Sequence, residues 1–284
     1  MAISMNLLAV FARTRAFACL LCALVCAAAE SAAPDLAANW QIQSLGPVQF
    51  VEWDPAVRGG PDRQLLLFVH GTPGSLTGFF SYLNDPLLRE RFHMIAVTRP
   101  GWLSRDDPKI PDLGQQAAAL APLLRRNRST EAAILLGHSY GGPVIARTAM
   151  DYPDLVAGLV FVASTGDPAL SGPRWYNRVA TVLPELLLGA DLKGANAEIL
   201  PLRPQLEAML PRWQTLTMPT LIVQGDRDRL VNPDNARFLQ GRLVQADVTL
   251  LWRPGQGHFV LWEEEPLIRD SLLARFPGDS GVER

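Results

Sequence analysis

Short apolar runs alternate with helix-like segments along most of the chain. Apolar runs of about four to eight residues are typical of strands buried on both faces of a sheet. Segments with apolar residues at three- and four-residue spacing predict the helices between them. The expected strands cover residues 48–53, 64–69, 93–97, 132–136, 159–163, 220–224 and 248–252. The expected helices cover residues 113–126, 142–150, 235–243 and 266–276, with a helical or mixed segment at 77–90.

This alternation predicts an α/β fold with a mostly parallel central sheet and helices on both of its faces. The strand at 48–53 alternates apolar and polar residues, so we expect it to be half exposed. Residues 169–212 depart from the pattern, because prolines and charges are scattered there and leucines fall in short helical patches. We therefore expect a small helical insertion at about 169–212, within one domain that spans residues 30–284.

The pentapeptide Gly137-His138-Ser139-Tyr140-Gly141 stands between a predicted buried strand and a predicted helix. A G-x-S-x-G turn in that context holds its serine in a strained backbone geometry and lifts the hydroxyl out of the sheet. Gly137 and Gly141 lack a Cβ atom, so strand and helix can approach each other closely. An ordinary turn with a solvent-facing serine gives the same five letters, so other segments have to decide.

A serine hydroxyl becomes a nucleophile at neutral pH only with a base beside it and an acid that orients the base. Among the four histidines, His258 fits the base, because it lies in a glycine-rich loop directly after the last strand. His70 precedes another glycine-rich turn, His93 opens a strand, and His138 adjoins the serine. We expect structural roles for these three.

Two aspartates, Asp226 and Asp228, follow the strand at 220–224, and only one of them can orient the histidine. We predict Asp228 for that role and expect Asp226 to cap the turn or to pair with an arginine. Asp167, after the strand at 159–163, is the remaining alternative. With Asp228, the order along the chain is serine, aspartate, histidine.

The loop 70–75 follows the buried strand at 64–69 and is rich in glycine. Such a loop can aim backbone N–H groups at a ligand oxygen, and Thr72 is the better donor because Pro73 has no N–H. In parallel sheets, ligands bind at the carboxyl ends of the strands. We therefore expect this loop, Ser139, Asp228 and His258 to lie at one edge of the sheet.

These segments resemble the α/β-hydrolase fold, in the capped group that includes haloperoxidase-like, epoxide-hydrolase-like and carbon–carbon-bond hydrolases. The resemblance covers roughly residues 45–277. It is carried by motifs that each follow a strand, namely His70-Gly71-Thr72-Pro73-Gly74, Arg99-Pro100-Gly101, Gly137 to Gly142, Gly225 to Asp228, and Gly257-His258.

The resemblance implies a role for each matching position. Ser139 resembles the nucleophile, His258 the general base and Asp228 its orienting acid. The backbone N–H groups of Thr72 and Tyr140 resemble the oxyanion hole, and the insertion at 169–212 resembles the lid. Epoxide hydrolases and haloalkane dehalogenases have an aspartate in place of Ser139, which argues against both activities.

A second departure from the family is Thr98, because an aspartate commonly precedes the Arg99-Pro100-Gly101 motif. The implied activity is that of a serine hydrolase, free of cofactor and metal, that cleaves an ester or related acyl bond of a small or medium-sized substrate through an acyl-enzyme on Ser139. Three alternatives stay open: acyl transfer to peroxide or an alcohol, cleavage of a carbon–carbon bond beside a ketone, and a binding protein that has lost catalysis.

The expected partner is a small molecule, partly apolar, because the insertion region offers large apolar side chains. These are Trp175, Tyr176, Leu186, Leu187, Leu188 and Trp213. Each of them fits packing inside the insertion equally well. The formal net charge is −2, and no basic stretch is long enough to predict a nucleic-acid partner.

The first thirty residues have the pattern of a secretory signal peptide. Arg13 and Arg15 precede an apolar run over 16–29, which ends in three alanines before Glu30 and is short for a membrane span. We expect residues 1–29 to be removed on export to the periplasm or the exterior; an uncleaved anchor is the alternative. All three cysteines lie in this run, so the rest of the chain needs no disulfide and offers no thiolate.

Overall fold

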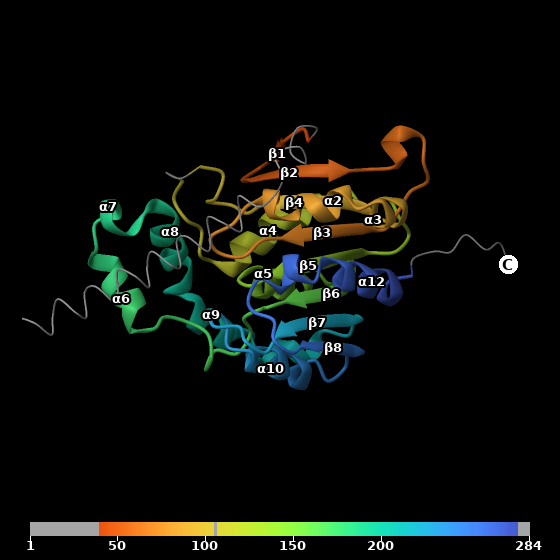
Figure 1. Ribbon diagram of the computed structural model, residues 1–284. Helices are drawn as coiled ribbons and strands as arrows, with labels where there is room; N and C mark the ends of the chain where they lie inside the picture. Colours follow the sequence, from red (N-terminus) through yellow and green to blue (C-terminus); the bar gives the residue numbers. More distant parts are fainter. Residues whose placement is uncertain (1–39, 105–106, 278–284) are drawn as a thin grey trace, which may run out of the picture. The chain divides into compact units, whose positions relative to one another are not determined.

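The computed structural model describes residues 40–104 and 107–277, so the expected signal segment at 1–29 lies outside the described residues. Eight strands form one sheet in the order β1-β2-β4-β3-β5-β6-β7-β8 (Figure 1). They are β1 (Gln43–Leu45), β2 (Val48–Trp53), β3 (Leu65–Val69), β4 (His93–Thr98), β5 (Ala133–His138), β6 (Val156–Val162), β7 (Thr220–Gly225) and β8 (Val248–Arg253).

From β4 to β8 the neighbouring strands run parallel, and β1 and β2 join antiparallel at one edge. The expected α/β fold with a mostly parallel sheet is therefore confirmed. Only β1 was not expected, because three residues carry no readable pattern. It pairs with the outer edge of β2, and Phe50 and Val51 of β2 are both buried, so this strand is less exposed than its alternation predicted.

Helices cover both faces of the sheet. On one face, α4, α5 and α10 pack on Leu67, Leu135 and Ile222, together with other residues of a single core cluster. On the other face, Phe68 contacts Phe79 and Tyr82, and the Tyr82 hydroxyl donates to the carbonyl of Leu261 at 2.6 Å. The helices of this framework are α2 (Phe80–Asn84), α3 (Pro86–Arg91), α4 (Leu113–Leu124), α5 (Gly141–Asp151), α10 (Asp234–Arg242), α11 (Val260–Glu263) and α12 (Glu265–Arg275).

The chain between β6 and β7 folds into helices, as expected for residues 169–212. They are α6 (Trp175–Val182), α7 (Glu185–Leu188), α8 (Ala190–Ile199), α9 (Leu202–Met209) and the 3-10 helix η4 (Leu210–Thr215). In Figure 1, α6, α7 and α8 lie on the side toward which the carboxyl end of β3 points. We call residues 169–212 the insertion. Within the described ranges, none of the helices combines the length and the apolar character needed to cross a bilayer.

Candidate active site

Ser139 occupies the sharp turn between β5 and α5. Its φ angle is +54°, a left-handed conformation that costs a residue with a side chain about 1–3 kcal/mol. Backbone bonds hold it there: its N–H donates to Val162 at 3.0 Å, and its carbonyl accepts from Gly142 at 3.1 Å. The strained turn expected from the sequence is therefore present.

The glycines of the elbow are needed because backbones meet there. A Cβ atom on Gly137 would stand 2.6 Å from the carbonyl oxygen of Gly141, and one on Gly141 would stand 2.9 Å from the carbonyl oxygen of His70. A Cβ atom on Gly142 would collide with the hydroxyl of Ser164, in the segment after β6. Close packing of β5, α5 and the next strand therefore depends on these glycines.

Asp228 and His258 come from the ends of neighbouring strands, β7 and β8, and meet at the same edge of the sheet. The Nδ1 atom of His258 lies 2.7 Å from Oδ2 of Asp228, and both side chains are nearly buried. Burial by itself raises the pKa of Asp228. Hydrogen bonding and charge from His258 and the N–H groups of Val231 and Leu230 outweigh it, so the pKa lies below that of an ordinary aspartate.

An ionised Asp228 can only accept hydrogen bonds, which fixes the tautomer of its partner. His258 must carry its proton on Nδ1 and leave Nε2 with a free lone pair while the ring is neutral. That is the state in which an imidazole can take a proton from a hydroxyl.

Asp226 holds a turn, as expected, and Asp167, the alternative acid, holds another. The Oδ1 atom of Asp226 accepts the N–H of Gly255 at 2.7 Å, which ties the turn after β7 to the turn after β8. The Oδ1 atom of Asp167 accepts the N–H of Ala169 at 2.8 Å.

His138 contacts His258, a contact that the sequence did not predict. Its Nε2–H donates to the backbone carbonyl of His258 at 3.1 Å, and the two rings lie 4.9 Å apart. Burial, helped by the charge of His258, lowers the pKa of His138 to about 3, so this ring is neutral. Since His138 adjoins Ser139, the contact brings the His258 loop to the nucleophile turn.

The loop after β3 also touches the nucleophile turn. A Cβ atom on Gly71 would stand 2.8 Å from Cβ of Ser139, so Gly71 lies directly against the serine. The Thr72 hydroxyl is buried and has no hydrogen-bond partner among the described residues. Tyr140 is the N-cap of α5, and N–H groups at a helix N-terminus favour negative charge. Both residues predicted to donate N–H groups thus lie beside Ser139.

His70 has the structural role expected of it. Its Nε2 accepts the backbone N–H of Arg99 at 3.0 Å, so its Nδ1–H donates to the carbonyl of Gly71 at 2.7 Å. Burial and the charge of Arg99 lower the pKa of His70 well below its ordinary value. Thr98, where the family commonly has an aspartate, accepts the N–H of Leu76 at 3.1 Å and ties β4 to the first turn of η2 (Leu76–Phe79).

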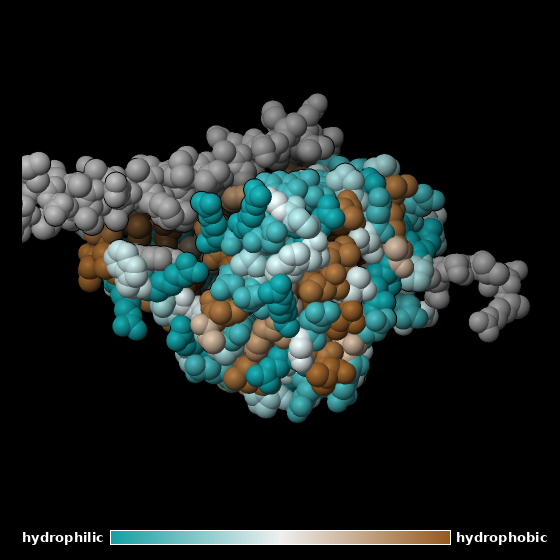
Figure 2. All heavy atoms as spheres, turned by 60° about the horizontal axis from the view of Figure 1, so that its bottom comes forward, coloured by the Kyte–Doolittle hydropathy of each residue, from teal (hydrophilic) through white to brown (hydrophobic). Residues whose placement is uncertain are grey.

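The large apolar residues of the insertion region fall into two groups. Trp213 is fully buried against Phe161 and Phe238, so it belongs to the core beneath the sheet rather than to a substrate surface. Trp175, Leu186 and Leu187 are exposed by 70%, 96% and 67%. Figure 2 shows hydrophobic surface at the end of the molecule that carries α6 and α7.

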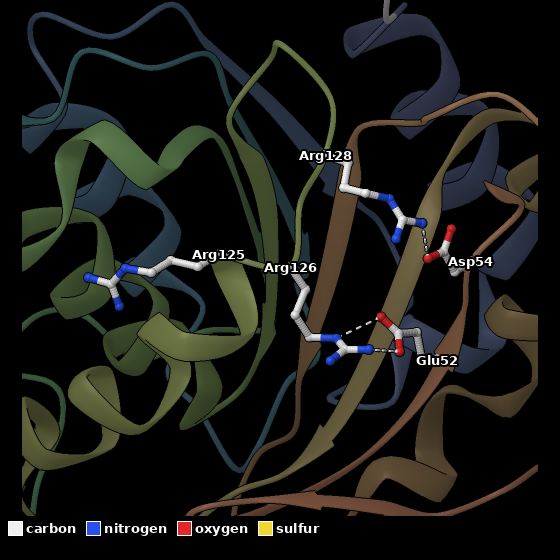
Figure 3. Close-up of a pocket in the computed structure, with 5 residues that line it drawn as sticks. All are labelled: Glu52, Asp54, Arg125, Arg126 and Arg128. Carbon is white, nitrogen blue, oxygen red and sulfur yellow. Dashed lines mark hydrogen bonds and ion pairs between the residues drawn. The ribbon is translucent and has the colours of Figure 1, made fainter. Parts of the chain in front are cut away.

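A second cluster of charges lies at the opposite ends of the strands from Ser139 and His258. A pocket of about 290 Å³ lies between the end of β2 and the turn after α4, and Figure 3 shows the residues that line it. Arg126 donates to both oxygens of Glu52, at 2.9 and 2.5 Å, Arg128 pairs with Asp54, and Arg125 points away from them. The amino ends of β4 and β5 lie at this cluster, whereas Ser139 follows the carboxyl end of β5 and His258 that of β8.

Glu52, Asp54 and His93 of this second cluster have ligand atoms within 4.8 Å of one another, a spacing that could hold a metal ion. However, His93 also bonds Glu52 at 2.8 Å. Burial alone would raise the pKa of Glu52, but its bonds to His93 and Arg126 outweigh burial and lower the pKa to about 2. The arginines already neutralise these carboxylates, so we interpret the group as an ion-pair network that joins β2, β4 and the turn before β5.

Comparisons with known proteins agree with this fold. The sequence profile of the Alpha/beta hydrolase family matches residues 66–269. An uncharacterized hydrolase, YugF, of Bacillus subtilis is 24% identical over 76% of this chain and 90% of its own length. A monoacylglycerol lipase of Mycolicibacterium smegmatis is 27% identical over 50% of this chain and 60% of its own length. The crystal structure of a membrane phospholipase A, described as a bacterial virulence factor, superposes with a TM-score of 0.61 at 18% identity, covering 96% of this chain and 98% of that one.

Proposed function

Since the chain belongs to the Alpha/beta hydrolase family, we propose that it is a serine hydrolase that cleaves an ester or related acyl bond through an acyl-enzyme on Ser139. The observation that carries the proposal is the Asp228–His258 hydrogen bond of 2.7 Å at the strand ends beside a strained serine turn. The similarity to a monoacylglycerol lipase, a protein named for an acyl ester, points in the same direction.

The reaction follows from the proton positions. His258 Nε2 removes the hydroxyl proton as the Ser139 oxygen attacks the carbonyl carbon, and Asp228 stabilises the imidazolium that forms. The negative oxygen accepts hydrogen bonds from the N–H groups of Thr72 and Tyr140, and each such donor is worth roughly 3 kcal/mol. The imidazolium then gives its proton to the leaving alcohol. Water releases the acyl group by the same steps, with His258 again as base.

The proposed substrate is small or medium-sized and partly apolar, and the insertion serves as the lid over it. The exposed Trp175 and Leu187 supply apolar surface on this lid. The Thr72 hydroxyl, which bonds none of the described residues, supplies one polar group beside Ser139. A series of nitrophenyl esters of increasing acyl length measures this preference. We expect kcat/KM to pass through a maximum at short or medium chains.

A fluorophosphonate probe tests the mechanism directly. It should label the wild-type protein on Ser139, and Ser139→Ala should abolish both labelling and ester turnover. In the wild-type protein, kcat/KM should fall toward acid pH with a slope of one proton, because the base must be neutral. His258→Ala should lose most turnover and should also lose this acidic limb. A His258→Ala variant with near-normal turnover and the same acidic limb would overturn the assignment. An unlabelled, inactive wild-type protein would favour a binding function.

The proposal includes export, with residues 1–29 removed. Its basis is the charged start, the apolar run over 16–29 and the alanines before Glu30. The intact mass of the protein from its native host should correspond to a chain that begins near Glu30. A protein that keeps Met1 and stays in the cytoplasm would contradict this.

A further inference from the structure

The guanidinium of Arg99 is fully buried beside the proposed oxyanion hole, and its donors bond three different parts of the chain. Its Nε donates to the carbonyl of His70 at 3.0 Å, and its Nη2 donates to the carbonyl of Gly71 at 2.7 Å. Both carbonyls belong to the loop after β3. One side chain therefore bonds two carbonyls of the loop that carries Thr72.

The carbonyl of Gly71 and the N–H of Thr72 belong to the same peptide unit. That unit is trans, so its carbonyl and its N–H point in opposite directions. The carbonyl accepts from both Arg99 Nη2 and His70 Nδ1–H, each at 2.7 Å. Two donors on the oxygen fix the plane of the peptide, and they thereby fix the direction of the Thr72 N–H on its other side.

Arg99 also contacts the residue that supplies the second N–H. Its guanidinium carbon lies 4.9 Å from the centre of the Tyr140 ring, within the range of a cation–π contact. The Tyr140 hydroxyl donates to the carbonyl of Pro111 at 3.1 Å, which fixes the far end of the same ring. One guanidinium therefore contacts the peptide unit that carries the Thr72 N–H and the side chain of Tyr140.

The charge of Arg99 is balanced from the insertion. Glu198 of α8 accepts from Arg99 Nη1 at 2.7 Å and from Nη2 at 3.0 Å, and its side chain is fully buried. Gln116 of α4 accepts from Nη1 at 2.7 Å and donates to Glu198 at 3.2 Å. A two-pronged pair of this kind sets the orientation of the guanidinium as well as its charge. The direction of the Thr72 N–H therefore depends on where α8 lies.

We propose that Arg99 and Glu198 are positioning residues, which align the oxyanion-hole N–H groups and make that alignment depend on the seating of the insertion. The inference rests on the proposed function. It goes further by assigning to α8 a part in transition-state stabilisation, although α8 contributes no residue to the serine, histidine and aspartate set.

The test compares an oxo ester with its thiono analogue, in which C=S replaces C=O. Sulfur is larger than oxygen and accepts hydrogen bonds poorly, so aligned N–H donors favour the oxo ester. In Glu198→Gln we expect kcat for the oxo ester to fall about tenfold or more with KM nearly unchanged. We expect the oxo-to-thiono ratio of kcat/KM to fall by a similar factor, because the loss is confined to the oxyanion.

Two further variants make the result independent of folding. Arg99→Met combined with Glu198→Leu removes both charges together, so no buried ion is left unpaired, and replacement of a buried pair by apolar residues is often tolerated. It should fold and still lose the preference for the oxo ester. Arg212→Lys is the matched control: Arg212 pairs with Asp151 at 2.7 Å and ties η4 to α5, away from the loop after β3, so the ratio should not change.

The possible outcomes separate the two proposals. If fluorophosphonate labels Ser139 and the wild-type protein cleaves esters, but the folded double variant keeps the wild-type ratio, the positioning role is overturned and the serine hydrolase stands. If the wild-type protein neither reacts with the probe nor cleaves esters, the proposed function fails and this inference fails with it. A ratio that falls equally in Arg212→Lys would show a general loss of stability and also overturn the positioning role.

Discussion

At the scale of single residues, two aspartates of one turn have different partners. Asp228 faces His258, whereas Asp226 accepts the N–H of Gly255 from the neighbouring turn. Both aspartates follow β7, so a position after a strand did not separate them, and the resemblance to the α/β-hydrolase fold implied the acid role for Asp228. The sequence did not indicate that His138 would contact His258, since nothing in the pentapeptide tells which way that ring turns.

The first prediction tests this division. Asp228→Asn should keep the fold and lower kcat by about 10³–10⁴-fold, because the amide no longer stabilises the imidazolium and can favour the wrong tautomer of His258. Asp226→Asn should cost less than about tenfold, because an amide oxygen can still accept the N–H of Gly255. Steady-state kinetics on one activated ester compares the two variants, and a larger loss in Asp226→Asn would reverse the assignment.

At the scale of elements, the regular strands and helices were predictable and the insertion was predictable only as helical. The buried strands repeat one composition, so β3, β5 and β7 could be read from their apolar runs. In α6 the apolar Trp175, Val179 and Val182 are exposed, whereas Asn177 is buried and donates to Asn196 of α8 at 2.8 Å. In this helix apolar side chains face solvent and a polar side chain is buried, so the rule that apolar residues face the core predicts the wrong buried face.

The second prediction concerns the junction of β3 and α5. Gly141→Ala should lower the free energy of unfolding by about 3 kcal/mol, because the new Cβ meets backbone carbonyls of β3 and its loop, which cannot move aside. Gly241→Ala is the matched control within α10. A Cβ there has nothing within 4 Å, so it should raise stability by about 0.5–1 kcal/mol. Urea midpoints with unchanged m values measure both, and equal effects would contradict the close approach seen here.

At the scale of the whole molecule, the contacts that matter most join residues far apart in the sequence. The motif around Arg99 could be recognised in the sequence, but Glu198 lies 99 residues further on, in a segment without a regular pattern. No spacing rule connects the two, because the contact exists only once α8 packs against the core. The sequence therefore predicted the fold and the proposed serine, aspartate and histidine set, but not the pair behind the oxyanion loop.

Two buried neutral histidines also make the stability of the whole molecule depend on pH. Burial lowers the pKa of His138 to about 3 and that of His70 well below its ordinary value, whereas in the unfolded chain both titrate near ~6.5. Below that pH the unfolded state binds protons that the folded state does not, so stability falls as pH falls. Each histidine contributes a slope of about 1 kcal/mol per pH unit.

The third prediction follows from this sign. Between pH 6.5 and 5 the free energy of unfolding should fall by roughly 2–4 kcal/mol, and the carboxylates with lowered pKa values, Asp228 and Glu52, should add to the loss only below about pH 4.5. Urea unfolding followed by circular dichroism at half-unit steps measures it. His138→Gln can still donate to the carbonyl of His258, so it should fold and show about half the wild-type slope. A wild-type stability that stays constant from pH 7 to 5, or a variant with the full slope, would mean that these rings accept protons in the folded protein. The same curve defines the pH range in which a fall in kcat/KM reports on His258 rather than on unfolding.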